Sequence, residues 1–179
     1  MEKLIKKLFI LCVVLGWGMP TTDALAQNGD SALSDPEIAS IAVVANQIDI
    51  DFAEIAKERS SDEQVLGLAK TMASDHQMVI DGAAELVTRL NVTPEDNAVS
   101  QQLSEDAEAT KKRLRNLPQE DFDEAYIDNE VAYHEKVIAA VRDLLVPQAS
   151  NQELKALLEK VLPILEGHLE HAKMIQKNH

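Results

Sequence analysis

Apolar residues recur at helical spacing in four long stretches of this chain. The stretches run from about residue 36 to 60, 62 to 90, 121 to 147 and 151 to 177. Apolar positions three and four residues apart lie along one face of an α-helix, so each stretch predicts an amphipathic helix. No stretch alternates apolar and polar residues in the way that predicts a half-buried strand. The pattern therefore predicts an all-α protein.

Residues typical of helix ends lie beside these stretches. Asp35 is predicted to cap the first helix, with Pro36 at its first position, where a missing N–H is tolerated. Pro163 lies inside the fourth stretch and predicts a kink, because proline deletes one backbone hydrogen bond. The second and fourth helices are predicted to start with capping boxes, formed by Ser61 with Gln64 and by Ser150 with Glu153.

Residues 95–117 connect the second and third stretches and show a weaker apolar stripe. They predict a shorter and more exposed helix on a crossover between two helical hairpins. Two hairpins joined by a crossover are typical of the ferritin-like four-helix bundle. We therefore expect a ferritin-like bundle over residues 36–177, after a disordered lead-in over residues 27–35.

The first 26 residues predict a secretory signal peptide. Lysines at positions 3, 6 and 7 precede an apolar run over residues 8–15, and Ala24-Leu25-Ala26 offers a cleavage site. The apolar run is shorter than the roughly 20 residues of a membrane span, although an uncleaved anchor is the alternative. Cleavage after Ala26 would deliver the protein to the periplasm or the cell exterior. Cleavage would also remove Cys12, which is the single cysteine.

The chain is acidic, with a formal net charge of −14. Such a chain repels nucleic-acid phosphates and anionic lipid head groups, which argues against binding to nucleic acid. The mature chain also has no predicted membrane span. Its exposed acidic face leaves open an interaction with a cationic protein partner.

Each long helix carries a polar residue near its middle, on or beside its apolar stripe. Antiparallel helices of similar length share the level of their midpoints, so we expect these side chains to converge in the core. Without partners, each would cost on the order of 1 to 3 kcal/mol to bury. The residues are Asp49 on the first helix, His76 on the second, Glu130 and His134 on the third, and His168 on the fourth.

Three interpretations of these residues stay open at this point. They form a hydrogen-bonded layer that fixes helix register, they bind one transition-metal ion, or they lie at the surface, an option that applies above all to Asp49. Imidazole and carboxylate groups are suitable ligands for zinc, iron or copper. No Glu lies three residues before any histidine, which argues against a di-iron centre. His171 is a weaker additional candidate, and Asp75 is expected to point away from His76.

Three motifs in this order resemble a secreted bacterial family called domain of unknown function 4142. The resemblance extends over roughly residues 36–176 and implies a ferritin-like bundle in the periplasm or at the cell surface, with no catalytic residues. Many members have Glu where Asp49 stands here. The motifs are Asp75-His76, Phe122-Asp123-x-x-Tyr126 before His134, and Leu162-Pro163 followed by His168-Leu169.

The mature chain contains no Gly-rich phosphate loop, no serine elbow and no catalytic cysteine. The sequence therefore favours a non-catalytic binding or structural protein of the envelope. The alternative is a metal-binding protein, for sequestration or redox chemistry, that uses the histidine and carboxylate residues of the core.

Overall fold

The computed structural model describes residues 32–178, and the predicted signal peptide lies outside this range. No strand occurs between residues 32 and 178, so the predicted all-helical fold is confirmed. None of the helices in this range is long and apolar enough to cross a membrane. The helices are α1 (Asp35–Arg59), α2 (Glu63–Leu90), α3 (Ala98–Asn116), α4 (Gln119–Ala140), the π-helix η2 (Val141–Leu145), α5 (Val146–Gln148) and α6 (Gln152–Gln176).

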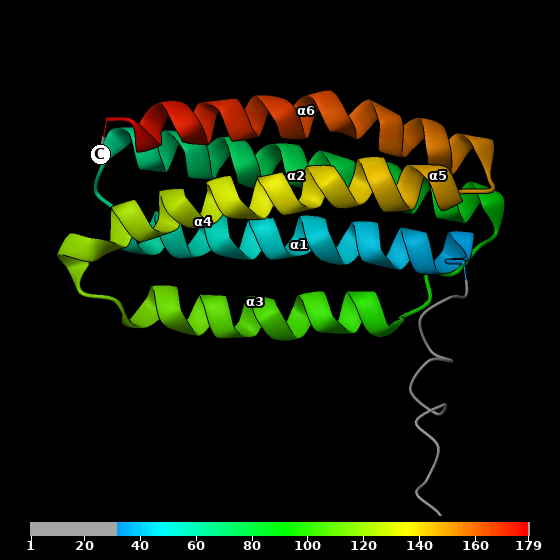
Figure 1. Ribbon diagram of the computed structural model, residues 1–179, viewed down its shortest axis with the longest axis horizontal. Coiled ribbons are helices and arrows are strands. Elements are labelled where there is room, and N and C mark those ends of the chain that lie inside the picture. The colour runs from blue at the N-terminus through cyan, green and yellow to red at the C-terminus, as the bar shows by residue number, and fades with distance from the viewer. Residues whose placement is uncertain (1–31, 179) are drawn as a thin grey trace, which may run out of the picture. The chain divides into compact units, whose positions relative to one another are not determined.

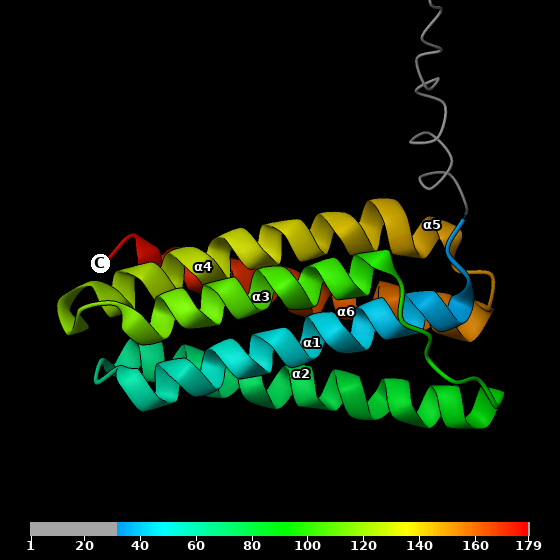
Figure 2. The ribbon, with the colours of Figure 1, turned by 90° about the horizontal axis from the view of Figure 1, so that it is seen from below.

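The long helices form a bundle in which each runs antiparallel to the one before it (Figure 1). Helices α1 and α2 form one hairpin, and α4 and α6 form the other. Helix α3 runs back along the outside of α1 and α4, so that α4 begins at the end of the bundle where α2 begins (Figures 1 and 2). The predicted bundle and the extra helix on its crossover are therefore confirmed. Its ferritin-like character stays a prediction.

The start of α1 differs from the expected cap at Asp35. The Ser34 hydroxyl accepts a hydrogen bond from the Glu37 N–H, and the Glu37 carboxylate accepts one from the Ser34 N–H, which together make a capping box. The Asp35 carboxylate is then free to accept hydrogen bonds from the N–H groups of Ser150 and Asn151 at 2.8 and 3.0 Å. Asp35 thus joins the start of α1 to the loop before α6.

Helices α2 and α6 each begin one residue later than the sequence predicts. Their caps are Asp62 and Asn151 rather than Ser61 and Ser150. The side-chain oxygen of each cap accepts hydrogen bonds from two backbone N–H groups of the first turn. A carboxylate or amide oxygen is a strong acceptor at this position, which accounts for the shift.

The third predicted helix does not run unbroken to residue 147. Ordinary α-helix ends at Ala140, and η2 carries the chain to Leu145 with a wider turn, in which the Val146 N–H donates to the carbonyl of Val141, five residues back. Pro147 lies in the short α5 that follows, and it has no N–H to donate to the preceding turn. In contrast, α6 continues through Pro163 as one helix.

Polar contacts attach α3 to α1. The Arg59 guanidinium, at the end of α1, donates hydrogen bonds to the backbone carbonyls of Leu114, Arg115 and Leu117 at 2.7–2.9 Å. Closer to the middle, the Lys111 ammonium lies 2.9 Å from the Asp51 carboxylate. These contacts hold the C-terminal part of α3 against α1.

The buried apolar residues form two clusters, one in each half of the bundle. We call the first the packed half; it contains the aromatic rings of Phe52, Phe122 and Tyr126, which are at most 2% exposed. We call the second the open half; its buried members are aliphatic, among them Leu86, Leu145 and Leu165. The three histidines predicted at the helix midpoints lie between these two clusters in the sequence of their helices, whereas Asp49 and Glu130 lie at the edge of the packed half.

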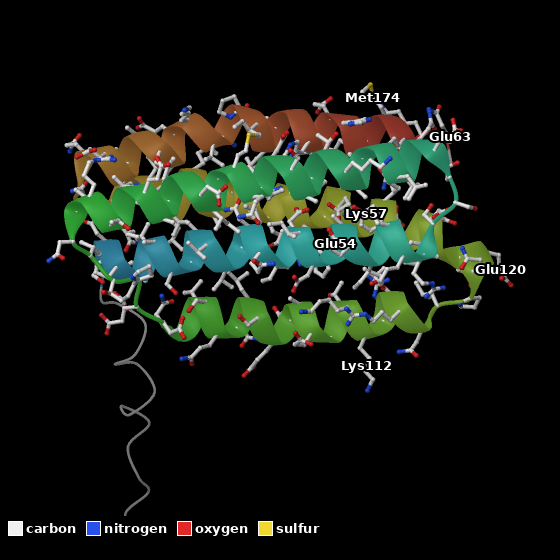
Figure 3. All side chains as sticks on the ribbon, turned by 180° about the vertical axis from the view of Figure 1, so that it is seen from behind. Glu54, Lys57, Glu63, Lys112, Glu120 and Met174 are labelled. Atoms are coloured by element: carbon white, nitrogen blue, oxygen red, sulfur yellow. The ribbon has the colours of Figure 1, made fainter. Side chains whose placement is uncertain are left out.

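Charged side chains cover the outer faces of the helices (Figure 3). Glu54 and Lys57 of α1 form an exposed ion pair at 2.6 Å, and Lys112 projects from α3 away from the bundle. Met78 and Met174 are also exposed, at 61% and 57%, whereas Met72 is fully buried.

Candidate metal centre

All five residues predicted for the core layer are buried, each with at most 5% of its surface exposed. The carboxyl groups of Asp49 and Glu130 are completely buried, which rules out the surface position that was an option for Asp49. The predicted convergence is confirmed, because every long helix of the bundle contributes to one polar layer. Its members are Asp49 from α1, His76 from α2, Glu130 and His134 from α4, and His168 from α6.

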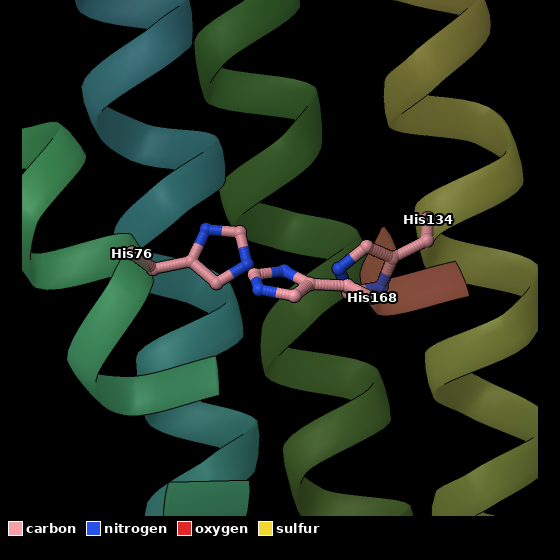
Figure 4. A group of neighbouring side chains, drawn as sticks. All are labelled: His76, His134 and His168. Atoms are coloured by element: carbon pink, nitrogen blue, oxygen red, sulfur yellow. The ribbon is translucent and has the colours of Figure 1, made fainter. Parts of the chain in front are cut away.

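The three imidazole rings meet in the centre of the bundle (Figure 4). Their centroids are separated by 5.7 Å between His76 and His134, 5.1 Å between His76 and His168, and 5.5 Å between His134 and His168. One nitrogen from each ring lies within 4.8 Å of the others, as a shared ligand requires.

The orientation of the His76 ring is fixed by Asn46, one turn before Asp49 on α1. The Asn46 amide nitrogen donates to the Ala42 carbonyl at 2.7 Å, which directs the amide oxygen toward His76. That oxygen lies 2.7 Å from His76 Nδ1 and only accepts hydrogen bonds, so Nδ1 carries the proton. The lone pair of His76 is therefore on Nε2, on the side facing Asp49.

The other two rings are fixed in the same manner by acceptors. His134 Nδ1 lies 3.0 Å from the backbone carbonyl of Glu130, so it donates its proton there and leaves a lone pair on Nε2. His168 Nε2 lies 3.0 Å from the Asp75 carboxylate and donates to it, which leaves the lone pair on Nδ1. Each histidine thus donates its N–H to one acceptor and keeps a lone pair on its other ring nitrogen.

Asp75 and Asn46 are the members of the site that sequence reasoning missed. Asp75 does point away from His76, as expected, but it points toward His168 on α6. Asn46 lies three residues before Asp49, on the same face of α1, and this spacing is the one signal that would have identified it. Partners of this kind orient metal-binding histidines in many proteins.

Two carboxyl groups complete the layer. Asp49 Oδ2 lies 3.4 Å from His76 Nε2 and 3.5 Å from His134 Nε2, and Glu130 Oε2 lies 3.8 Å from His134 Nδ1. Burial raises the pKa of Asp49 to about 7. Burial, followed by the neighbouring charge of Asp49, raises the pKa of Glu130 well above its usual range. We therefore assign Glu130 as the protonated member of the pair at neutral pH.

The histidines are neutral at physiological pH. Burial, followed by repulsion from His134 and His168, lowers the pKa of His76 to about 3. Burial also lowers the pKa of His134 to about 4, in spite of the hydrogen bond to the Glu130 carbonyl. A neutral imidazole has an unshared pair on one nitrogen, which is the form that binds metal.

The inward-facing atoms of the layer have no hydrogen-bond partner among residues 32–178. Three are lone-pair nitrogens, which only accept hydrogen bonds, whereas the protonated Glu130 carboxyl can donate to Asp49. A divalent cation would satisfy the nitrogens and Asp49 together, after the rings close to the roughly 2.0–2.1 Å of a zinc–nitrogen bond. The atoms are both carboxyl oxygens of Asp49, His76 Nε2, Glu130 Oε2, His134 Nε2 and His168 Nδ1.

The remaining histidine candidate does not join this site. His171 is half-buried and belongs to neither group of residues that the structure brings within metal-binding distance. The two groups are His76 with His134 and His168, and Asp49 with Glu130 and His134. They share His134, so they describe one centre.

Comparison with known proteins places the chain in a family. The model of the family described as Domain of unknown function (DUF4142) matches residues 20–175, and the chain belongs to this family. No curated protein and no solved structure gave a significant match. The residues of the site are therefore what indicates the function.

Proposed function

We propose that this DUF4142 protein is an exported helical bundle that binds one divalent transition-metal ion in its core. The ligands are His76 Nε2, His134 Nε2 and His168 Nδ1, with Asp49 beside them as a further oxygen ligand. Imidazole nitrogens suit zinc, copper and iron; three imidazoles with one carboxylate supply four ligands, and a zinc ion can take a fifth. The sequence supports export, through the signal peptide that it predicts over residues 1–26.

One observation carries the proposal. Each histidine donates its single N–H outward, to Asn46, the Glu130 carbonyl or Asp75, and its free nitrogen faces the other two. A layer that served only to fix helix register would pair its polar groups with one another. Here the outer partners are satisfied, and leaving the inner atoms bare would cost on the order of 1 to 3 kcal/mol each.

The proposed role is to hold the ion rather than to turn over a substrate. Asn46 and Asp75 keep the rings in the binding orientation, and burial keeps them neutral. Protonated Glu130 contributes no charge, so Asp49 supplies the one negative charge beside the cation. The family contributes no catalytic residues to this account.

Metal analysis of protein purified without chelator or affinity tag tests the proposal. We expect about one equivalent of zinc, copper or iron, and we expect it to be lost in His76→Ala and His134→Ala. His171→Ala is the matched control, since it removes a histidine one turn from His168 but outside the layer; it should keep its metal. Circular dichroism would verify that each variant is folded.

Thermal unfolding supplies an independent readout. After removal of metal, an ion at about 100 times its Kd should stabilise the native protein by about 2.7 kcal/mol. If zinc, copper and iron all leave the melting temperature of metal-free protein unchanged, the layer is structural and the proposal is wrong. Equal loss of metal in His171→Ala and His76→Ala would contradict the assigned ligands.

A further inference from the structure

A cavity of about 300 Å³ runs from the metal centre into the open half of the bundle. Ligand pockets in proteins begin at about this size, and an apolar cavity of roughly half the volume binds benzene. Most of its wall is aliphatic, supplied by residues such as Val79, Ala83 and Leu86 of α2 and Leu158 and Leu165 of α6. The wall is therefore suited to a hydrocarbon chain.

The inner end of the cavity is polar. Asp49, His76 and His134 line it, and each is at least 97% buried. The atoms that they present are among those without a hydrogen-bond partner in residues 32–178. The cavity thus combines an apolar wall with a polar end formed by one carboxyl group and two imidazoles.

The π-helix η2 shapes the far end. Val141 and Leu145, its first and last residues, both line the cavity. A π turn adds a residue to the helical repeat, and such turns occur frequently at functional sites. Here the π turn borders the cavity.

The lining also includes exposed charged residues. Asp106 of α3 and Lys136 of α4 are exposed and belong to the same cavity wall. Their position indicates that the cavity reaches solvent where α3 faces α4. Asp106 and Lys136 carry opposite charges, so this mouth by itself favours neither sign of ligand.

We propose that this cavity binds a small amphiphile with an aliphatic chain and a carboxylate head, the head reaching the metal centre. Head coordination rests on the proposed metal site, whereas chain binding in the cavity does not. The lining agrees with this class, because an aliphatic wall ends at Asp49, His76 and His134, which would hold the cation. A carboxylate is a suitable oxygen ligand for such a cation. The aliphatic chain then lies between α2, α4 and α6.

Calorimetric titration with straight-chain alkanoates, from butanoate to dodecanoate, tests the proposal on the zinc-loaded protein. Each added methylene should lower Kd about fourfold until the cavity is filled, and the gain should then stop. Metal-free protein should bind octanoate at least tenfold more weakly than the zinc form. Octanol, which has no anionic head, should bind both forms alike.

Two alanines of α2 provide matched variants. Ala83 is buried and lines the cavity, whereas its neighbour Ala84 is exposed and does not. Ala83→Leu should weaken octanoate binding at least tenfold and move the plateau to shorter chains. Ala84→Leu should bind as the unaltered protein does.

The outcomes separate this proposal from that of the metal site. Zinc binding with no dependence of alkanoate affinity on chain length would overturn the amphiphile site and leave the metal site standing. Octanol binding that is blocked by Ala83→Leu, in a protein that takes up no metal, would support the chain site and overturn both the metal site and head coordination. Equal octanoate affinity in Ala83→Leu and Ala84→Leu would place the ligand elsewhere and contradict the proposal.

Discussion

The two halves of the bundle are built from the same helices but are filled differently. In the packed half, rings such as Phe52, Phe122 and Tyr126 fill the space between the helices. In the open half, smaller aliphatic side chains surround a cavity of about 300 Å³. Interiors are normally close-packed, and a void costs stability because its lining atoms lack contacts. The difference indicates that one half provides stability and the other provides space beside the polar layer.

The largest expected difference in the free energy of unfolding comes from truncating one leucine in each half of the bundle. Leu68 and Leu86 lie on one face of α2, five turns apart, at 0% and 4% exposure. Leu68→Ala should lower the free energy of unfolding by about 3–5 kcal/mol, because it creates a cavity in a packed core. Leu86→Ala should cost about 2 kcal/mol, since Leu86 already borders open space. Urea unfolding measures both, and equal costs would show that the halves do not differ in packing.

Replacement of Asp49 tests how much the buried carboxyl group of the polar layer lowers the free energy of unfolding. The pKa of Asp49 is about 7 in the folded protein, against 3.8 as the ordinary value, so the folded state keeps a proton that the unfolded state loses between those pH values. Stability therefore falls as the pH rises through this window, by about 1.4 kcal/mol per pH unit. Asp49→Asn should remove this loss, so metal-free Asp49→Asn should be up to about 4 kcal/mol more stable than the unaltered protein at pH 7.

The pH profile separates Asp49 from the histidines. Their pKa values are lowered from 6.5 to about 3 for His76 and about 4 for His134, so they reduce stability as the pH falls below 6.5. The histidine contributions have the opposite pH dependence, so the difference between the two profiles reports Asp49 together with Glu130, whose pKa the Asp49 charge raises. A stability gain in Asp49→Asn that is constant from pH 4 to pH 7 would show that Asp49 does not titrate as described.

Replacing a buried alanine by leucine should change the free energy of unfolding in opposite directions in the two halves. Ala69 is fully buried in the packed half, and Ala83, fourteen residues later on α2, lines the cavity. Ala69→Leu should destabilise the protein by about 1–3 kcal/mol through overpacking. Ala83→Leu should leave the free energy of unfolding unchanged or raise it. Thermal or urea unfolding decides the sign, and a similar loss in both variants would mean that the cavity does not accept a larger side chain.

The partners of the histidines should affect metal affinity more than stability. Asn46→Ala and Asp75→Ala each remove an acceptor that orients a ring. Loss of such partners typically costs 10–100-fold in metal affinity, and we expect zinc binding to weaken by about that factor. Asp81→Ala, an exposed carboxylate on α2, serves as the control for Asp75. Unchanged zinc affinity in Asn46→Ala and Asp75→Ala would mean that the ring orientations seen here do not matter for binding.

The sequence was sufficient to identify the polar layer. Helical periodicity determines which face of a helix a residue lies on, and helix length determines its level in the bundle. Both quantities placed His76, His134 and His168 at one level of the core. Asn46 and Asp75 were missed as partners because their roles depend on side-chain direction and on the neighbouring helix. Spacing along α1 places Asn46 on the face of Asp49, but it gives neither the direction of the side chain nor its neighbour.

The cavity and the π-helix η2 could not be predicted for a related reason. An apolar stripe specifies which residues face the core, but it does not specify whether their volumes fill the space between helices. Leu86 and Leu165 match the pattern of core residues as well as Leu68 does, yet they border the cavity. Helix caps were misplaced by one residue because Ser61 and Ser150 each precede a residue that caps helices about as well as serine does, Asp62 and Asn151.

Long-range ¹H–¹⁵N NMR of the imidazole rings tests the central claim most directly. In metal-free protein at neutral pH, His76 and His134 should carry their proton on Nδ1, whereas His168 should carry it on Nε2. One equivalent of zinc should shift His76 Nε2, His134 Nε2 and His168 Nδ1 and leave His171 unchanged. Zinc that leaves all three rings unchanged, or that shifts the opposite nitrogens, would contradict a metal centre built from these histidines.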